Sequence, residues 1–294
     1  MATPVPADAI EPFAAPSVFE SIASIYGFLA DRRKQVIAAV AVPLGLAFIV
    51  LLLTLRYYFS TLAVYLALHD VRTASHAVSA TVVGLLLWLL LNVIACGRLT
   101  RLVAGEPPQP WFDIRPHALE ATINAAVLRF LLVLVAAGAL AAELATAGAR
   151  LVEPAESGLV VVSCLAALAA FAFVFVVRCG LLLPALSYHR RRQILRRGWE
   201  YSGERFWHFA AVATIAVLLP SFLLQFLGEI GAQFLVADHG EAAARTFAEA
   251  AAILAKDGAE ILVVAFTLSI SSAVCLTLWT IASGLIYRSL TEAG

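Results

Sequence analysis

Residues 77–96 read AVSATVVGLLLWLLLNVIAC, a stretch of twenty residues without a charged side chain. About 20 apolar residues in a helix cross the hydrocarbon core of a bilayer, and lipid offers no partner to open backbone groups. Five more stretches meet this requirement, and they are residues 36–55, 121–144, 159–187, 206–229 and 260–287. The sequence therefore predicts an all-α polytopic membrane protein with six transmembrane helices, each of them continuous.

The composition agrees with a membrane protein and argues against a soluble one. Of the 294 residues, 62% are hydrophobic and 14% are charged, with a mean hydropathy of +0.91, whereas soluble domains carry about 45–50% apolar and about 25% charged residues. The formal net charge is +0, so the global charge indicates no nucleic-acid partner.

An amphipathic helix is predicted before the first span, over residues 17–34. Ser17 and Glu20 have the spacing of a capping box, and a basic cluster at residues 32–34 closes the segment. Apolar side chains recur at helical spacing, namely Val18, Ile22, Ile25 and Leu29. Such a helix is expected to lie on the membrane surface, although a short soluble helix has the same pattern. Residues 1–16 are polar and rich in Pro and Ala, and we expect a flexible tail there.

The basic residues predict the orientation of the domain formed by residues 35–288. Thirteen of the twenty Lys and Arg residues lie on the side of the two termini, five lie on the opposite side and two lie within spans. By the positive-inside rule both termini are cytoplasmic. Residues 237–259 are Ala-rich and acidic, and we expect them to form a helical connector on the periplasmic side.

The sequence contains no recognisable catalytic or metal-binding motif. The histidines lack the His-x-x-x-His spacing of a helical metal site, and there is no Gly-x-Ser-x-Gly elbow or P-loop. The cysteines lie inside apolar segments without a C-x-x-C pair, and we expect small core residues at Cys96, Cys164, Cys179 and Cys275. We therefore expect a protein that is not an enzyme and has no metal or other cofactor.

Two arginines inside the spans are candidates for an anion or lipid site. Arg129 and Arg178 lie about 12 and 13 Å from the cytoplasmic ends of antiparallel spans, at 1.5 Å per residue. A charge at this depth is costly and often functional. Two like charges at one level would repel unless an anion lay between them, and a lipid phosphate would suit arginine. Alternatively, each arginine reaches the interface or pairs with a carboxylate from Glu120, Glu200 or Glu204.

The cytoplasmic loop before the fifth span is a second candidate for lipid contact. Residues 189–207 read HRRRQILRRGWEYSGERFW. Arg196, Arg197 and Trp199 combine charge with an aromatic ring, which favours a helix lying on anionic head groups. The positive-inside bias alone would also explain the charge.

Three spans contain a proline that removes a helical hydrogen bond. Pro43, Pro184 and Pro220 leave the carbonyls of Ala39, Gly180 and Ala216 without their usual donors. Transporters build binding sites at such breaks, but membrane helices also tolerate proline without any such role.

Residues 178–209 resemble a pattern in a broad family of uncharacterised bacterial membrane proteins, which is related to the non-catalytic membrane domain of some glycerophosphoryl diester phosphodiesterases. The matching positions are Arg178, Leu183, Pro184, Ala185, Trp199, Gly203, Phe206 and Trp207. Tyr201 and Ser202 stand where the family usually has Thr-Arg before the glycine. The phosphodiesterase barrel and its metal-binding carboxylates are absent from this sequence. The resemblance thus implies a module of a bacterial inner membrane without hydrolase activity.

These observations favour a non-enzymatic module that binds lipid or a membrane-protein partner, as an accessory or structural subunit. The expected ligand is a phospholipid, whose head group could be anionic, and the partner could be a second copy of the chain. A small transporter with a polar path between helices and a membrane enzyme acting on lipid remain as alternatives. A water-accessible cavity near the midplane would favour the transporter, and clustered acid or base groups would favour the enzyme.

The predicted orientation is testable with reporter fusions. A reporter fused after Gly294 should be active in the cytoplasm, and one inserted near Glu241 should be active only outside it, because positively charged loops are retained inside. Paired alkaline phosphatase and fluorescent protein fusions measure both positions. A periplasmic C-terminus would contradict the prediction.

Overall fold

The computed structural model describes residues 16–68, 71–110, 117–151, 154–189, 193–203, 205–237 and 258–292. This part of the chain is helical and contains no strand. The α-helices are α1 (Val18–Asp31), α2 (Arg33–Leu68), α3 (Val71–Ala104), α4 (Ala118–Leu151), α5 (Pro154–Phe175), α6 (Leu183–Tyr188), α7 (Ile194–Ser202), α8 (Phe206–Val212), α9 (Leu219–Ala237) and α11 (Gly258–Glu292). Two wider π-helical segments interrupt them, η2 (Val176–Gly180) and η3 (Ala213–Leu218). Residues 1–15 of the predicted tail and 238–257 of the predicted connector lie outside the described residues.

The six predicted spans are confirmed. Helices long and apolar enough to cross a membrane cover Arg33–Leu62, Val78–Ala104, Ala118–Gly148, Val160–Tyr188, Phe206–Gly228 and Ile261–Thr291. Each overlaps one predicted stretch, and most extend beyond it. The chain is therefore an all-α, multi-pass membrane protein.

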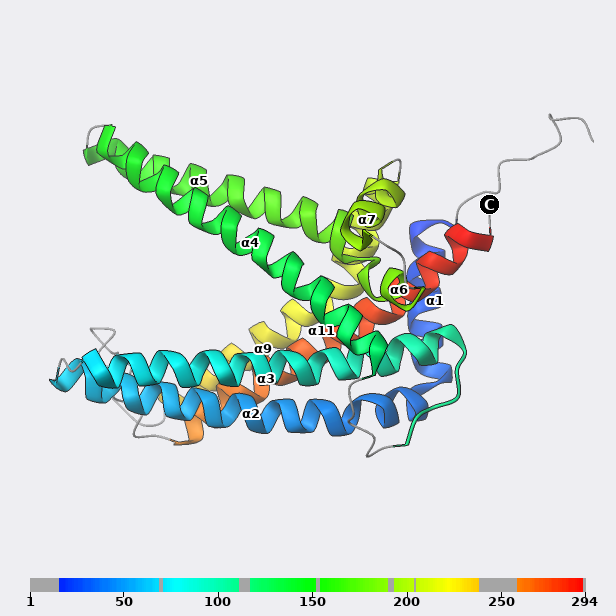
Figure 1. Cartoon of the computed structure of the whole chain (residues 1–294), viewed down its shortest axis with the longest axis horizontal. Helices are drawn as coiled ribbons and strands as arrows, with labels where there is room; N and C mark the ends of the chain where they lie inside the picture. The colour runs from blue at the N-terminus through cyan, green and yellow to red at the C-terminus, as the bar shows by residue number, and fades with distance from the viewer. Residues whose placement is uncertain are drawn as a thin grey trace, which may run out of the picture.

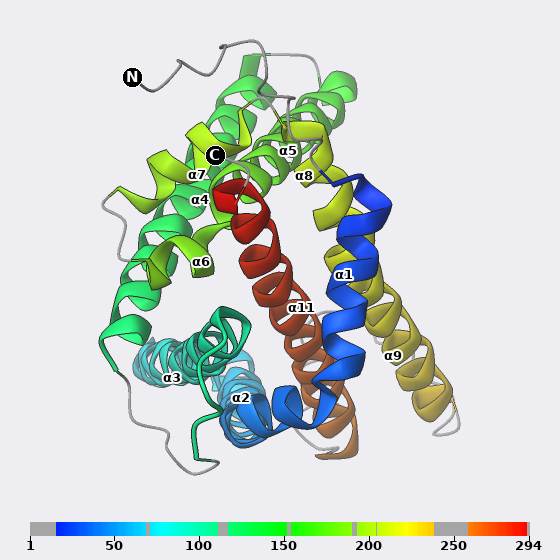
Figure 2. The ribbon, with the colours of Figure 1, turned by 90° about the vertical axis from the view of Figure 1, so that its right-hand side faces the viewer.

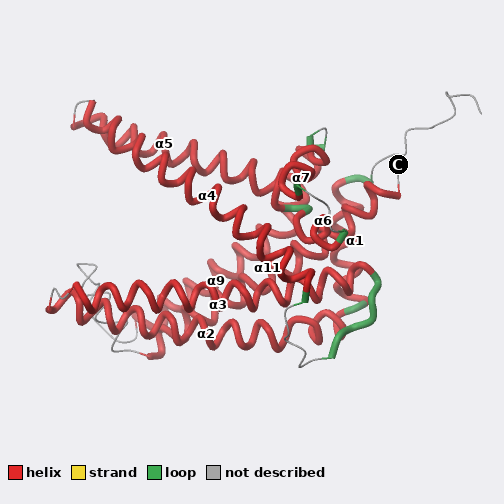
Figure 3. The backbone as a smooth tube through the Cα atoms, in the orientation of Figure 1, coloured by secondary structure: helices red, strands yellow, loops and turns green. Residues whose placement is uncertain are grey.

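The long helices form two arms that converge at one end of the molecule (Figure 1). Helices α2, α3, α9 and α11 run together in one arm, and α4 and α5 form a hairpin in the other. The spans of α4 and α5 have the smallest share of residues buried within the protein. Figure 3 shows that the loops and short helices gather where the arms meet, at the end that also holds α1, α6, α7 and the C-terminal end of α11.

Helix α1 lies across this end, transverse to α2 and α3, and packs on α11 and α8 (Figure 2). Its capping box is confirmed, because Ser17 Oγ accepts from Glu20 N at 3.2 Å and Ser17 N donates to Glu20 Oε2 at 2.6 Å. These hydrogen bonds lower the pKa of the Glu20 carboxyl. Ile25 on the inner face is fully buried, whereas Phe19 on the other face is 81% exposed. The predicted amphipathic helix thus has the direction of a helix parallel to a bilayer surface.

The prediction of continuous helices was wrong for the fourth span, which a turn interrupts, whereas the fifth span is continuous but includes a π-helical segment. The fourth passes from α5 through η2 and a turn into α6, and the fifth passes from α8 through η3 into α9. Each π-helical segment precedes a proline, Pro184 or Pro220. Because proline has no N–H, it cannot donate the regular α-helical hydrogen bond. The two carbonyls left open obtain partners from other helices. Trp279 Nε1 donates to Gly180 O at 3.1 Å, and the Tyr26 hydroxyl donates to Ala216 O at 3.3 Å.

The largest core cluster lies where α1, η2, α6, α8, η3 and α11 meet. Phe209, Leu186 and Ile281 are at most 1% exposed there. All four cysteines are free thiols, and Cys96 and Cys179 are buried as predicted, whereas Cys164 and Cys275 are half-buried. Packing is therefore densest at the end where the arms converge.

Helix α7 packs closely on η2 through Gly198. A Cβ at this position would lie 3.0 Å from Arg178 O and 3.1 Å from Cys179 O. The Ser202 hydroxyl also donates to Arg178 O at 3.4 Å. A side chain at this position would crowd these backbone atoms, so glycine favours the close approach that places α7 against the π-helical turn.

We expect opposite effects from alanine at two helical glycines. Gly198→Ala should lower the free energy of unfolding by about 1–3 kcal/mol, because its methyl group meets fixed backbone oxygens. Gly27→Ala in α1 meets nothing within 4 Å and should be neutral or stabilising by up to about 1 kcal/mol. Thermal unfolding of both purified variants in one detergent measures the difference. Equal melting temperatures would contradict the close contact of α7 with η2.

Candidate functional site

The structure brings two of the predicted site residues together, Arg178 and Trp199. Arg178 lies on η2, and its guanidinium is 4.5 Å from the centroid of the Trp199 ring and 5.4 Å from that of the Phe206 ring. Cation–π contacts of this kind stabilise a positive charge with few hydrogen bonds. Arg178 Nε is buried without a hydrogen-bond partner among the described residues. The rings of α7 and α8 therefore accommodate the charge that the sequence places inside the fourth span.

The other predicted arginines lie apart from this contact. Arg129 is exposed on α4 and forms no hydrogen bond, ion pair or ring contact with the described part of the chain. Arg196 pairs with Glu200 at 2.8 Å on the exposed face of α7, and Arg197 is half-buried. Neither Arg129 nor Arg178 pairs with Glu120 or Glu200, and Glu204 lies outside the described residues. An anion shared by Arg129 and Arg178 stays a prediction.

A buried ion pair that the sequence analysis did not identify joins α3 to α4. Arg101 Nη2 donates to Glu120 Oε2 at 2.9 Å, and the Glu120 side chain is 1% exposed. The same oxygen accepts from His117 N at 3.0 Å, at the start of α4. Gly97 makes room for the carboxylate, since a Cβ there would lie 2.5 Å from Glu120 Oε1. Because each charge is desolvated, neither is tolerated without the other.

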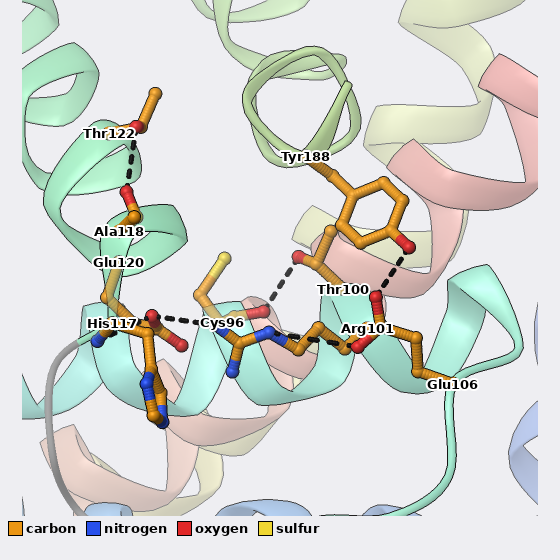
Figure 4. A network of polar contacts seen from close by, with 9 residues as sticks. All are labelled: Cys96, Thr100, Arg101, Glu106, His117, Ala118, Glu120, Thr122 and Tyr188. Carbon is orange, nitrogen blue, oxygen red and sulfur yellow. Dashed lines mark hydrogen bonds and ion pairs between the residues drawn. The ribbon is translucent and has the colours of Figure 1, made fainter. Parts of the chain in front are cut away.

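The turn after α3 extends this pair into a network (Figure 4). Gly105 ends the helix with a positive φ of 91°, while Gly105 N donates to Leu102 O and Glu106 N donates to Arg101 O. This is a Schellman motif, which favours glycine in its left-handed position. The turn brings Glu106 to Tyr188 of α6, whose hydroxyl donates to Glu106 Oε1 at 2.6 Å. Arg101 Nε is 4.0 Å from Glu106 Oε2.

Arg98 fixes the next part of the loop. It is 3% exposed, and its Nη2 donates to the carbonyls of Gln109 at 3.3 Å and Pro110 at 2.8 Å. The two arginines of α3 thus hold the loop against the bundle, one through a carboxylate and the other through backbone oxygens.

The network borders a polar cavity of about 370 Å³ at the end of the bundle where the arms meet. Its lining comes from the end of α3, the following loop, the start of α4 and the end of α6. The polar groups in it are Arg101, Glu106, Gln109, His117, Ser187 and Tyr188. One cationic and one carboxylate side chain therefore face a common space.

A second cavity of about 300 Å³ lies deeper, between the two arms. Helices α3, α4, α6 and α11 line it almost entirely with apolar side chains, including Trp88, Phe130, Leu183, Leu276 and Trp279. Its few polar residues, such as Thr280 and Cys96, are already engaged, because these two side chains lie 3.4 Å apart within hydrogen-bonding reach. This space suits a hydrocarbon chain better than an ion or a polar solute.

Sequence reasoning missed the network because it placed Arg98 and Arg101 in a loop. The signal in the sequence was Gly105, a helix-ending residue nine positions beyond the predicted end of the span at residue 96. Extending the helix to Ala104 puts Gly97 and Arg101 on one face, four residues apart. A glycine one turn before an arginine on that face would then have indicated space for a side chain that pairs with a buried charge.

The described residues contain no group of three or more His, Cys, Asp or Glu side chains arranged to hold a metal ion. No family model, curated protein or solved structure matches this chain.

The ion pair of Arg101 and Glu120 makes a testable contribution to stability. Arg101→Met should lower the free energy of unfolding by about 3–5 kcal/mol, because it leaves the Glu120 carboxylate buried and uncompensated. Adding Glu120→Gln to the same chain should restore most of the loss. Thermal unfolding in detergent compares the single and double variants, and a double variant no more stable than the single one would contradict the pairing.

Proposed function

We propose that the protein is a non-enzymatic module of the bacterial inner membrane that binds a lipid. The observation that carries the proposal is the apolar cavity between α3, α4, α6 and α11. Lipid is the most abundant apolar molecule beside a hydrocarbon-lined cavity between transmembrane helices. An acyl chain enters it without leaving a polar group unpaired.

The positions of the basic and aromatic groups support the same proposal. Arg178, Trp199 and Trp207 lie at the junction of η2, α7 and α8, and Trp207 is 80% exposed. Exposed tryptophan and arginine are typical of the level of lipid head groups. With both termini in the cytoplasm, this end of the bundle and helix α1 would face the inner leaflet.

The alternatives have less support. A transporter requires a water-filled path near the midplane, whereas the cavity between the arms is apolar. An enzyme acting on lipid requires free acid or base groups, but the buried carboxylate of Glu120 already accepts from Arg101 and His117. The resemblance of residues 178–209 to a non-catalytic membrane domain agrees with a binding module. The lipid-bound protein would then bind a membrane-protein partner or a second copy of the chain.

Filling the apolar cavity should reduce lipid binding. Ser272 of α11 lines the cavity, and Ser272→Phe should lower the lipid retained per protein several-fold, because the ring occupies the space of the acyl chain. Native mass spectrometry after gentle solubilisation counts the bound lipids. The matched control is Ile270→Phe, at an exposed position two residues away on the opposite side of α11.

The control variant should retain lipid as the natural chain does. Equal retention in Ser272→Phe and the natural sequence would refute binding in this cavity. Loss of lipid in both variants would assign the effect to the helix as a whole rather than to the cavity.

A further inference from the structure

The polar cavity and the apolar cavity follow one another along the same three helices. On each of α3, α4 and α6, a residue lining the apolar cavity is within five positions of one lining the polar cavity. The pairs are Cys96 and Arg101, Ile123 and Leu119, and Leu183 and Ser187. At 1.5 Å per residue, these steps are about 6–8 Å. This is the order of the distance between a phospholipid head group and the first part of its acyl chains.

The polar cavity holds two buried atoms that lack hydrogen-bond partners among the described residues. They are Arg101 Nη1, a charged donor on a residue 9% exposed, and Gln109 Oε1, an acceptor. Buried polar atoms are nearly always paired, so each unpaired one needs an explanation. A ligand that satisfies both must offer an acceptor to the arginine and a donor to the amide.

Charge narrows the class of ligand further. The cavity lining has Arg101, whose Nη2 is bound to Glu120 while its Nη1 is unpaired, and Glu106 as a carboxylate, whose side chain is 43% exposed. A purely anionic head group would be attracted by Arg101 and repelled by Glu106. A head group with a phosphate and an ammonium group matches both charges.

We infer that the polar cavity is a head-group site for a zwitterionic aminophospholipid, with its phosphate at Arg101 and its ammonium group toward Glu106 and Gln109. This inference rests on the proposed lipid-binding function and specifies the ligand of that site. Both unpaired atoms are buried, so binding requires a small movement of the side chains that line the cavity. The acyl chains then continue along α3, α4 and α6 into the apolar cavity.

The test measures head-group preference in the full-length protein. The purified chain is incorporated in nanodiscs of equimolar dioleoyl phosphatidylethanolamine and dioleoyl phosphatidylglycerol, released gently, and examined by native mass spectrometry. Retained lipid should favour the ethanolamine form about tenfold, the factor for one charge-assisted contact of about 1.4 kcal/mol. Glu106→Gln should abolish this preference, while an amide oxygen still accepts from Tyr188.

The matched control is Glu143→Gln, which removes the same charge from an exposed position on α4 and should keep the preference. A natural chain that favours phosphatidylglycerol, or that retains both lipids equally, overturns the head-group inference. So does a Glu106→Gln variant that still favours the ethanolamine form.

The outcomes separate this inference from the proposed function. Lipid retained without head-group preference, and lost in Ser272→Phe, leaves the apolar cavity as a lipid site and removes the head-group assignment. A natural chain that retains no lipid refutes both.

Discussion

The fold depends on one constraint, that every backbone carbonyl inside a bilayer needs a hydrogen-bond donor from the protein. Proline withholds that donor in three spans, and in the fourth and fifth a side chain from another helix supplies it. Trp279 of α11 donates a hydrogen bond to the carbonyl of Gly180, and Tyr26 of α1 donates one to the carbonyl of Ala216. The defects in the fourth and fifth spans are thus points of attachment, where α11 and the amphipathic helix are held to the rest of the bundle. The densest core lies around these two contacts.

Charge is accommodated by three different means in the same end of the molecule. Arg101 is neutralised by a carboxylate, Arg98 donates to backbone oxygens, and Arg178 lies over aromatic rings. Arg101 Nη1 has no hydrogen-bond partner among the described residues and belongs to a side chain that lines the polar cavity. This is why the candidate site lies between α3, α4 and α6, and not at the arginines that the hydropathy pattern singled out.

The spans and α1 could be predicted from the sequence, because length, hydropathy and a capping box are local properties. The sequence was not sufficient for the π-helical turns, although Pro184 and Pro220 marked where they would occur. Which helix supplies the missing donor is a matter of tertiary packing, and Tyr26 and Trp279 are far from those prolines in the chain. The ion pair of Arg101 and Glu120 was missed for a related reason. Its geometry depends on α3 continuing to Ala104 and on Gly97 making room, and neither follows from charge counting.

The hairpin of α4 and α5 is fastened to the other arm only near the end where the loops gather (Figure 1). Along the rest of its length little of the hairpin is buried within the protein, since only 11% of the most apolar part of each of its spans is buried. In a membrane these surfaces would be covered by acyl chains, so the packing of this arm would depend on the surrounding lipid as well as on the protein.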